Sequence, residues 1–235
     1  MPAAVLFDMD GTLVDTEELW WRGECAVMSG HGVAWTREDQ ATCLGGPLER
    51  VTAYMRERTG GSASEREIGE ALLVAVERLM REEPLAWRPG AASLLQECRS
   101  AGCPTALVSA SHRPLVHAVA QGVARDLGLP VDGIFEATVA GDEVSDSKPH
   151  PEPYLAASRA LGVPINRCVV VEDSPTGVAS GQASGAFVVA VPHIVGIPRA
   201  PRRVVLESLE GVTLAQLGLW MSEAGPTAHR GDAAG

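Results

Sequence analysis

The chain has 235 residues, of which 46% are hydrophobic and 21% charged, and its formal net charge is −11 at pH 7. This composition is typical of a globular protein, and the strong negative charge argues against a nucleic-acid partner. No run is apolar and long enough to span a bilayer, no secretory signal is visible, and the five cysteines form no C-x-x-C pair, so we expect a cytoplasmic protein with reduced thiols and no membrane partner.

The first predicted element is a short apolar strand over residues 5–7, which runs directly into Asp8, Asp10 and Gly11. Alternate side chains of a strand point the same way, so Asp8 and Asp10 are expected to face one pocket. Gly11 then allows the backbone to turn sharply. Because buried carboxylates without a partner are costly, the sequence predicts that a metal ion compensates their charge.

A long stretch with only helical signals follows, from about Thr16 to Trp87. A crossover between parallel strands needs only about a dozen residues. These helices are therefore predicted to form an insertion, and not a layer that packs on the sheet. The helical patterns cover 17–28, 47–58 and 64–81.

After Trp87, short apolar runs alternate with helical patterns. Short runs rich in β-branched residues are typical of strands covered on both faces. Helices are predicted to begin near Arg113 and after Pro151, the second ending at Gly162. The second to fifth strands are predicted over 105–108, 137–140, 168–171 and 187–191. This alternation predicts an α/β fold with a Rossmann-like parallel sheet core flanked by helices.

Polar residues follow these strands, at the edge where open parallel sheets bind ligands. Ser109 and Ala110 follow the second strand, where N–H groups and a hydroxyl ahead of a helix suit an anion. Ser111 alone could be the cap of that helix. Glu172 and Asp173 follow the fourth strand, and an acidic helix N-terminus is the alternative explanation for this pair.

Lys148 is the only lysine of the chain and stands ahead of three prolines that stiffen the backbone around it. Its ammonium group can neutralise a phosphate. The carboxylates of Asp8, Asp10, Glu172 and Asp173 would repel one another at one edge of a sheet. Oxygen ligands alone favour Mg²⁺, so the sequence predicts a Mg²⁺ and phosphate site there.

The sequences DMDGT, SAS, SKPHPEPY and VVVEDSPTG, in this order, resemble the four motifs of the haloacid dehalogenase (HAD) superfamily. The helical insertion resembles the cap of the subgroup that contains β-phosphoglucomutase, phosphoglycolate phosphatase and several sugar-phosphate phosphatases. The resemblance implies a core domain over 1–15 and 89–221 with a helical cap domain over 16–88. Residues 222–235 are small and polar and are predicted to form a disordered tail.

By this resemblance, Asp8 is the nucleophile that forms an aspartyl-phosphate, and Asp10 is the general acid and base. Lys148 is the catalytic lysine that bridges the nucleophile and the phosphoryl group. The implied Mg²⁺ ligands are Asp8, Asp10 through its backbone carbonyl, Asp173 and Glu172. The implied substrate-binding residues are Thr12, Trp20, Glu49, Arg50, Ser109 and Ala110.

The residues present favour one activity of this superfamily. Its dehalogenases lack the second aspartate, which Asp10 supplies here. Proteins that resemble β-phosphoglucomutase have a His where this chain has Trp20 and an Arg where Glu49 stands, with Arg50 adjacent. The sequence favours a Mg²⁺-dependent phosphatase for a small phosphorylated sugar or polyol, as a monomer or homodimer. A sugar-phosphate mutase and a non-catalytic phosphometabolite-binding protein are the alternatives.

Overall fold

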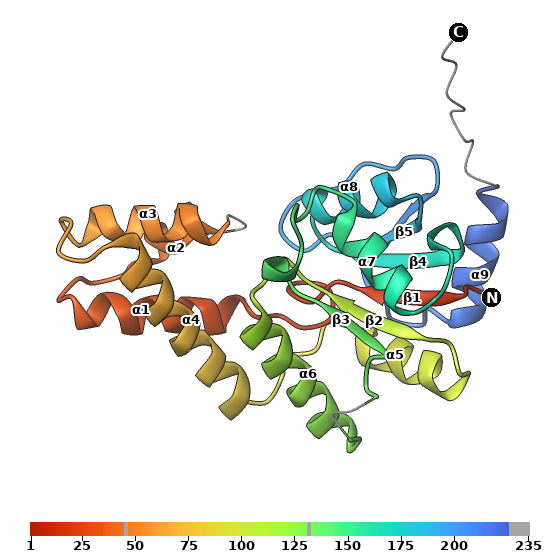
Figure 1. The fold of residues 1–235 in the computed structure, drawn as a ribbon, viewed down its shortest axis with the longest axis horizontal. Helices are drawn as coiled ribbons and strands as arrows, with labels where there is room; N and C mark the ends of the chain where they lie inside the picture. The colour runs from red at the N-terminus through yellow and green to blue at the C-terminus, as the bar shows by residue number, and fades with distance from the viewer. Residues whose placement is uncertain (45–46, 131–132, 226–235) are drawn as a thin grey trace, which may run out of the picture.

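The computed structural model describes residues 1–44, 47–130 and 133–225. In these ranges, six parallel strands form one sheet in the order β3-β2-β1-β4-β5-β6. The sheet with its flanking helices confirms the predicted α/β, Rossmann-like architecture (Figure 1). No helix in the described ranges has both the length and the hydropathy that a membrane crossing requires.

The strands end close to where the sequence predicts. They are β1 Ala4–Phe7, β2 Thr105–Val108, β3 Ala137–Val139, β4 Cys168–Glu172, β5 Phe187–Ala190 and β6 Arg203–Val205. The first five match the predicted runs to within one residue at either end. The sequence patterns did not reveal β6, because this edge strand is only three residues long and half-buried.

Helices on the two faces of the sheet bury alternate strand residues. Val5 and Phe7 face a cluster that includes helices α5, α6 and α9, whereas Leu6 faces a second cluster formed with α7 and α8. These core helices are α5 Ala91–Ser100, α6 Arg113–Leu127, α7 Glu152–Ala160, α8 Pro175–Ser184 and α9 Leu214–Glu223, with the 3₁₀ turns η1 Gly141–Glu143 and η2 Ile165–Arg167. Both faces of β1 are therefore covered. The first polar side chain, Asp8, follows directly after the end of the strand.

Four helices stand apart from the sheet (Figure 1). They are α1 Glu17–Gly30, α2 Arg37–Cys43, α3 Leu48–Arg58 and α4 Glu65–Glu82. The sequence patterns missed α2, a polar helix of seven residues that starts at a capping box between Thr36 and Asp39. We call residues 17–82 the helical part.

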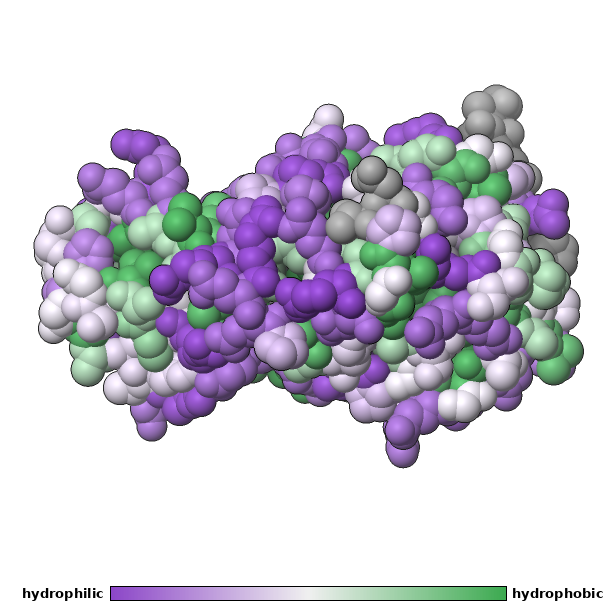
Figure 2. All heavy atoms as spheres, turned by 90° about the horizontal axis from the view of Figure 1, so that it is seen from below, coloured by the Kyte–Doolittle hydropathy of each residue, from purple (hydrophilic) through white to green (hydrophobic). Residues whose placement is uncertain are grey.

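The chain enters and leaves the helical part at one place. Asp15 N–H donates to the Ala86 carbonyl at 2.7 Å, and Arg88 N–H donates to the Leu13 carbonyl at 3.0 Å. The end of α4 also lies against α6 of the sheet part, where the Arg125 guanidinium donates to backbone carbonyls (Figure 1). On the face in Figure 2, hydrophilic residues gather around this junction. The two parts thus meet through paired backbone segments and a polar contact.

The C-terminal boundary differs from the prediction. Helix α9 continues to Glu223 and includes Ser222, so the predicted tail over 222–235 does not begin at Ser222. The helix continues because Leu214 and Leu217 bury its inner face against the sheet part. Positions 226–235 lie outside the described residues.

The interior of the helical part holds a carboxyl group. Glu24 is 4% exposed, and the Trp35 indole N–H donates to its Oε2 at 2.8 Å. Burial raises the pKa of Glu24 from 4.5 to about 7. Between these pH values the folded protein holds a proton that the unfolded chain has released, so the free energy of unfolding falls as the pH rises from about 4.5 to about 7.

The variant Glu24→Gln removes this ionisation and keeps an acceptor for Trp35. We expect it to raise the free energy of unfolding by about 1–3 kcal/mol at pH 8, where the native Glu24 is ionised, and to change it little at pH 4. Urea unfolding at both pH values measures this, with Glu38→Gln on exposed α2 surface as the control. A variant that is less stable than the native protein at pH 8 would contradict it.

Candidate active site

Asp8 and Lys148 form a buried ion pair at the carboxyl end of β1. Asp8 N–H still donates to the Val171 carbonyl of β4 at 3.0 Å, which fixes the backbone where its side chain leaves the sheet. Lys148 Nζ donates to Asp8 Oδ1 at 2.6 Å, to Glu172 Oε1 at 2.7 Å and to the Val108 carbonyl at 2.9 Å. The Lys148 side chain is 4% exposed, so its three N–H donors have fixed partners.

Burial and neighbouring charges both shift the pKa values of this pair. Burial lowers the pKa of Lys148, but the neighbouring carboxylates of Asp8 and Glu172 outweigh it and leave that pKa raised. Burial and the repulsion from Glu172 hold the pKa of Asp8 well above its usual range, although Lys148 opposes them. The one ammonium therefore does not compensate all of the negative charge around it.

Glu172 is held by donors on both of its oxygens. Oε1 accepts from Lys148 and from the Tyr154 hydroxyl at 2.8 Å, while Oε2 accepts from Asp173 N–H at 3.1 Å and from the Ser174 N–H and hydroxyl at 3.2 and 3.1 Å. A Cβ on Gly177 would lie 1.7 Å from Oε1, so helix α8 can approach Glu172 only with a glycine there. This arrangement makes Glu172 an anchor for Lys148, and its role as a metal ligand stays a prediction.

Asp10 accepts from three hydroxyl groups. Thr16 donates to its Oδ1 at 2.6 Å, and Ser111 and Ser109 donate to its Oδ2 at 2.9 and 3.2 Å. Ser111 is therefore not the cap of α6, whose cap is His112. The hydroxyls come from the carboxyl end of β2 and from the entry to α1, so Asp10 lies where the two parts of the chain meet.

The turn after β2 keeps a backbone donor unused. Ser109 Oγ accepts from Ser111 N–H at 2.9 Å, which closes the turn around Ala110. In the described part of the chain, no acceptor is bound to the Ala110 N–H. This is the arrangement expected of a cradle for a phosphate oxygen, the role predicted for Ser109 and Ala110.

Three carboxylates lie close enough to share a cation. One oxygen each of Asp8, Glu172 and Asp173 lies within 4.8 Å of the others. Thr12, 2% exposed, donates to Asp173 Oδ1 at 3.2 Å and so orients that carboxylate, and its contact with a substrate stays a prediction. Burial and the charge of Glu172 raise the pKa of Asp173 to about 7. An all-oxygen donor set with excess negative charge fits Mg²⁺.

Among the described residues, no hydrogen bond or ion pair joins the predicted substrate-binding residues of the helical part to this cluster. Trp20 is half-buried and packs against the main hydrophobic cluster. Glu49 and Arg50 are exposed in the first turn of α3, and the Arg50 guanidinium donates to backbone carbonyls of residues 42–44 at 3.2–3.4 Å. Their contact with a substrate stays a prediction.

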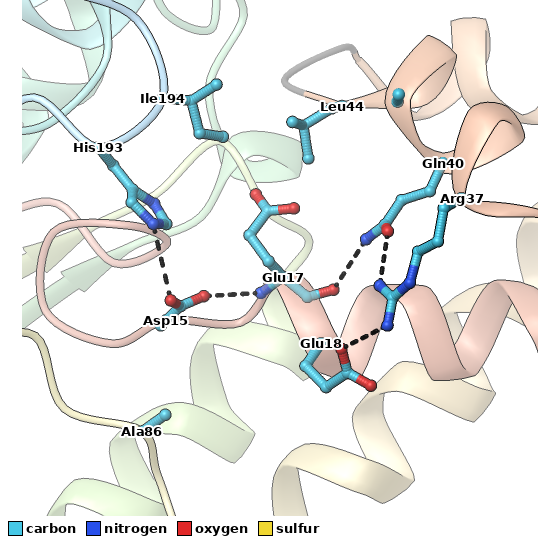
Figure 3. A pocket seen from close by; sticks show the side chains of 10 residues that line it. Asp15, Glu17, Glu18, Arg37, Gln40, Leu44, Ala86, His193 and Ile194 are labelled. Atoms are coloured by element: carbon cyan, nitrogen blue, oxygen red, sulfur yellow. Dashed lines mark hydrogen bonds and ion pairs between the residues drawn. The ribbon is translucent and has the colours of Figure 1, made fainter.

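A cavity of about 510 Å³ opens between the helical part and the sheet part (Figure 3). Asp15 and Glu17 line one part of it. In the chain these residues flank Thr16, whose hydroxyl donates to Asp10. His193, from the loop after β5, lies beside Asp15, with its Nε2 3.6 Å from Asp15 Oδ2, on the side of the cavity away from Gln40. Its lining residues are Asp15, Glu17, Glu18, Arg37, Gln40, Ala41, Leu44, Ala86, His193 and Ile194.

Several residues of this site were missed by the sequence analysis. Tyr154 lies in the segment after Lys148, and Thr16 and Glu17 follow the first motif closely, so proximity in sequence could have suggested them. Nothing in the sequence pointed to His193, which lies in no motif and meets the site only through the fold.

The chain is similar to known proteins along most of its length. A family model described as haloacid dehalogenase-like hydrolase matches residues 2–185. Hexitol phosphatase A of Escherichia coli is 34% identical over 212 residues, which cover 90% of this chain and 93% of that protein. Protein CbbY of Rhodobacter capsulatus is 33% identical over 196 residues, covering 80% and 85% of the two chains.

The fold is also similar to that of a solved structure. A CbbY variant from Rhodobacter sphaeroides, in complex with xylulose-(1,5)bisphosphate, superposes with a TM-score of 0.78 at 32% identity. The match covers 92% of this chain and 99% of that chain.

Proposed function

Because the chain belongs to the haloacid dehalogenase-like hydrolase family, we propose that it is a Mg²⁺-dependent phosphatase of a phosphorylated sugar or polyol. The observation that carries the proposal is the meeting of Asp8, Lys148 and Asp173 beside the hydroxyl-bound Asp10 at one edge of the sheet. The similarity to a hexitol phosphatase and to a protein solved with a sugar bisphosphate supports the substrate class.

The first step transfers the phosphoryl group to the protein. A carboxylate oxygen of Asp8 attacks phosphorus, the bond to the leaving oxygen breaks, and Asp10 gives its proton to that oxygen. Lys148 holds Asp8 Oδ1 at 2.6 Å and keeps its orientation fixed during the attack. The Ala110 N–H would hold a phosphoryl oxygen, and the Ser109 hydroxyl would join it by turning away from Asp10 Oδ2. The products of this step are the alcohol and an aspartyl-phosphate.

The second step returns the enzyme to its starting state. Asp10, now a carboxylate, takes a proton from water, whose oxygen attacks phosphorus as the bond to Asp8 breaks. Inorganic phosphate leaves, and both aspartates regain their first ionisation states. The hydroxyls of Thr16 and Ser111 would hold Asp10 in place through both steps.

Mg²⁺ would be held by Asp8 and Asp173, with the Asp10 carbonyl and Glu172 as the further predicted ligands. When bound, it neutralises charge on the phosphoryl oxygens and on the carboxylates around them. The raised pKa values of Asp8 and Asp173 are in keeping with a cation at this cluster.

The alternatives have weaker support. A mutase must bind a second phosphate, yet Arg50 and Arg37 both donate to groups of the protein itself in the described structure. Membership in a hydrolase family argues against a purely binding role. A cytoplasmic location and a monomeric or homodimeric state stay predictions from the sequence.

Hydrolysis of p-nitrophenyl phosphate tests the proposal. We expect turnover with Mg²⁺, loss of turnover with excess EDTA and recovery when Mg²⁺ is restored, because Lys148 alone does not neutralise the carboxylate cluster. A panel of sugar and polyol phosphates then tests the substrate class. Turnover that persists unchanged in EDTA, or no turnover of any phosphate ester, would contradict the proposed function.

A further inference from the structure

His193 reaches the edge of the carboxylate cluster from the loop after β5. Val191, two residues earlier, donates its N–H to the Glu172 carbonyl at 2.7 Å, which holds the start of this loop against β4. A Cβ on Gly11 would lie 3.1 Å from His193 Nδ1 and 2.3 Å from Asp173 Oδ2. The His193 ring and the Asp173 carboxylate therefore border the same small space beside Gly11.

This space adjoins the groups proposed to hold Mg²⁺. One oxygen of Asp173 lies within 4.8 Å of an oxygen of Asp8 and of Glu172. Gly11 follows Asp10 directly in the chain, and the Asp10 carbonyl is a further predicted ligand. A small donor beside Gly11 would therefore lie next to the proposed metal site.

The neighbour of Nε2 indicates which nitrogen of His193 accepts. Nε2 lies 3.6 Å from Asp15 Oδ2, a contact that Figure 3 marks. A carboxylate only accepts, so a neutral ring carries its hydrogen on Nε2 and presents Nδ1 as an acceptor. Burial and the charge of Arg88 lower the pKa of His193, in keeping with a neutral ring. Among the described residues, Nδ1 is buried and has no hydrogen-bond partner.

Two acceptors that border one space need a donor between them. With an ion bound, Asp173 is a carboxylate, so its Oδ2 and His193 Nδ1 both accept and cannot bond to each other. A water molecule has two O–H donors, and Mg²⁺ in proteins usually keeps several of its waters. A water of the ion's hydration shell is thus the donor whose chemistry fits this space.

We propose that His193 is a positioning residue of the metal site, whose Nδ1 accepts a hydrogen bond from a water molecule that Mg²⁺ retains. This inference rests on the proposed Mg²⁺-dependent phosphatase function and adds one residue to that site. His193 would contact neither the ion nor the phosphoryl group, so it acts through the water that it orients.

Calorimetric titration of the protein with Mg²⁺, at pH 8 and without substrate, tests the proposal by measuring the dissociation constant of the ion. We expect His193→Leu to raise this constant at least about 10-fold, because outer partners of a metal site typically change its affinity 10- to 100-fold. His193→Asn keeps an acceptor, since its amide oxygen can take the place of Nδ1, and should stay within about 3-fold of the native protein. The matched control His31→Leu, at the exposed end of α1, should leave the constant unchanged.

An unchanged dissociation constant in His193→Leu overturns the inference. An equal loss of affinity in His193→Leu and His193→Asn also overturns it, because the ring would then act by packing and not by accepting a hydrogen bond. Urea unfolding in EDTA verifies that both variants fold without the ion. If the native protein hydrolyses p-nitrophenyl phosphate with Mg²⁺ while these comparisons fail, only this inference is wrong. If the native protein neither binds Mg²⁺ nor hydrolyses that ester, the proposed function fails as well.

Discussion

The variant Asp8→Asn is expected to lose at least about 10⁴-fold in kcat, because an amide cannot take the place of the attacking carboxylate. Asn has nearly the same size as Asp, so it fits the position where Asp8 meets Lys148 and the end of β1. The measurement is Mg²⁺-dependent hydrolysis of p-nitrophenyl phosphate, with circular dichroism to verify the fold.

Asp10→Asn gives a sharp comparison for this prediction. Loss of a general acid and base lowers the rate by about 10²- to 10⁴-fold, but the nucleophile is still present. With p-nitrophenyl phosphate, whose leaving group departs without a proton, only the second step needs Asp10, so we expect the phosphorylated protein to accumulate in Asp10→Asn and to be absent in Asp8→Asn. Residual turnover in Asp8→Asn above about 1% of the native rate would contradict the assignment of the nucleophile.

The variant Lys148→Arg is expected to lose at least about 10²-fold in kcat although it keeps the positive charge. The ammonium group donates to Asp8, Glu172 and the Val108 carbonyl at 2.6–2.9 Å, in a position where the lysine side chain is 4% exposed. A planar guanidinium is larger and cannot direct its donors to these three acceptors. Asp8 would then be displaced from its line of attack.

Turnover and stability together distinguish this effect from misfolding. Lys148→Ala leaves Asp8 and Glu172 buried without their partner, so we expect its free energy of unfolding to fall by about 3–5 kcal/mol. Lys148→Arg should unfold cooperatively and fail in catalysis, whereas Arg159→Lys on the exposed side of α7 should behave like the native protein. Near-normal turnover of Lys148→Arg would show that a compact ammonium is not needed there.

Local sequence patterns could predict the sheet and the residues at its edge. A strand is marked by a short apolar run, and the residues at the edge of the sheet follow that run directly in the chain. The strand before Asp8 and the strand before Glu172 are apolar runs, and parallel strands bring their carboxyl ends to one edge. Helix α2 was not predicted, because its seven residues are mostly polar and too few to show a helical period of apolar residues.

The partners within the site could not be predicted in the same way. The hydroxyls of Thr16 and Ser111 both donate to Asp10. Their positions depend on how the chain enters the helical part and on where α6 begins, and no local sequence pattern encodes either. Likewise, Glu17 and His193 come from segments more than a hundred residues apart and meet only across the cavity. The sequence therefore predicted which polar groups lie at the edge of the sheet better than it predicted the groups that hold them or line the cavity.

The most direct test asks where the phosphoryl group resides during turnover. The Asp10→Asn protein is mixed with p-nitrophenyl phosphate and Mg²⁺, quenched with acid and reduced with borohydride, and mass spectrometry of the peptides then locates the modified residue. Our account predicts a reduced side chain at Asp8. A phosphoryl group on any other residue, or a protein that turns over substrate and never carries phosphate, would contradict it.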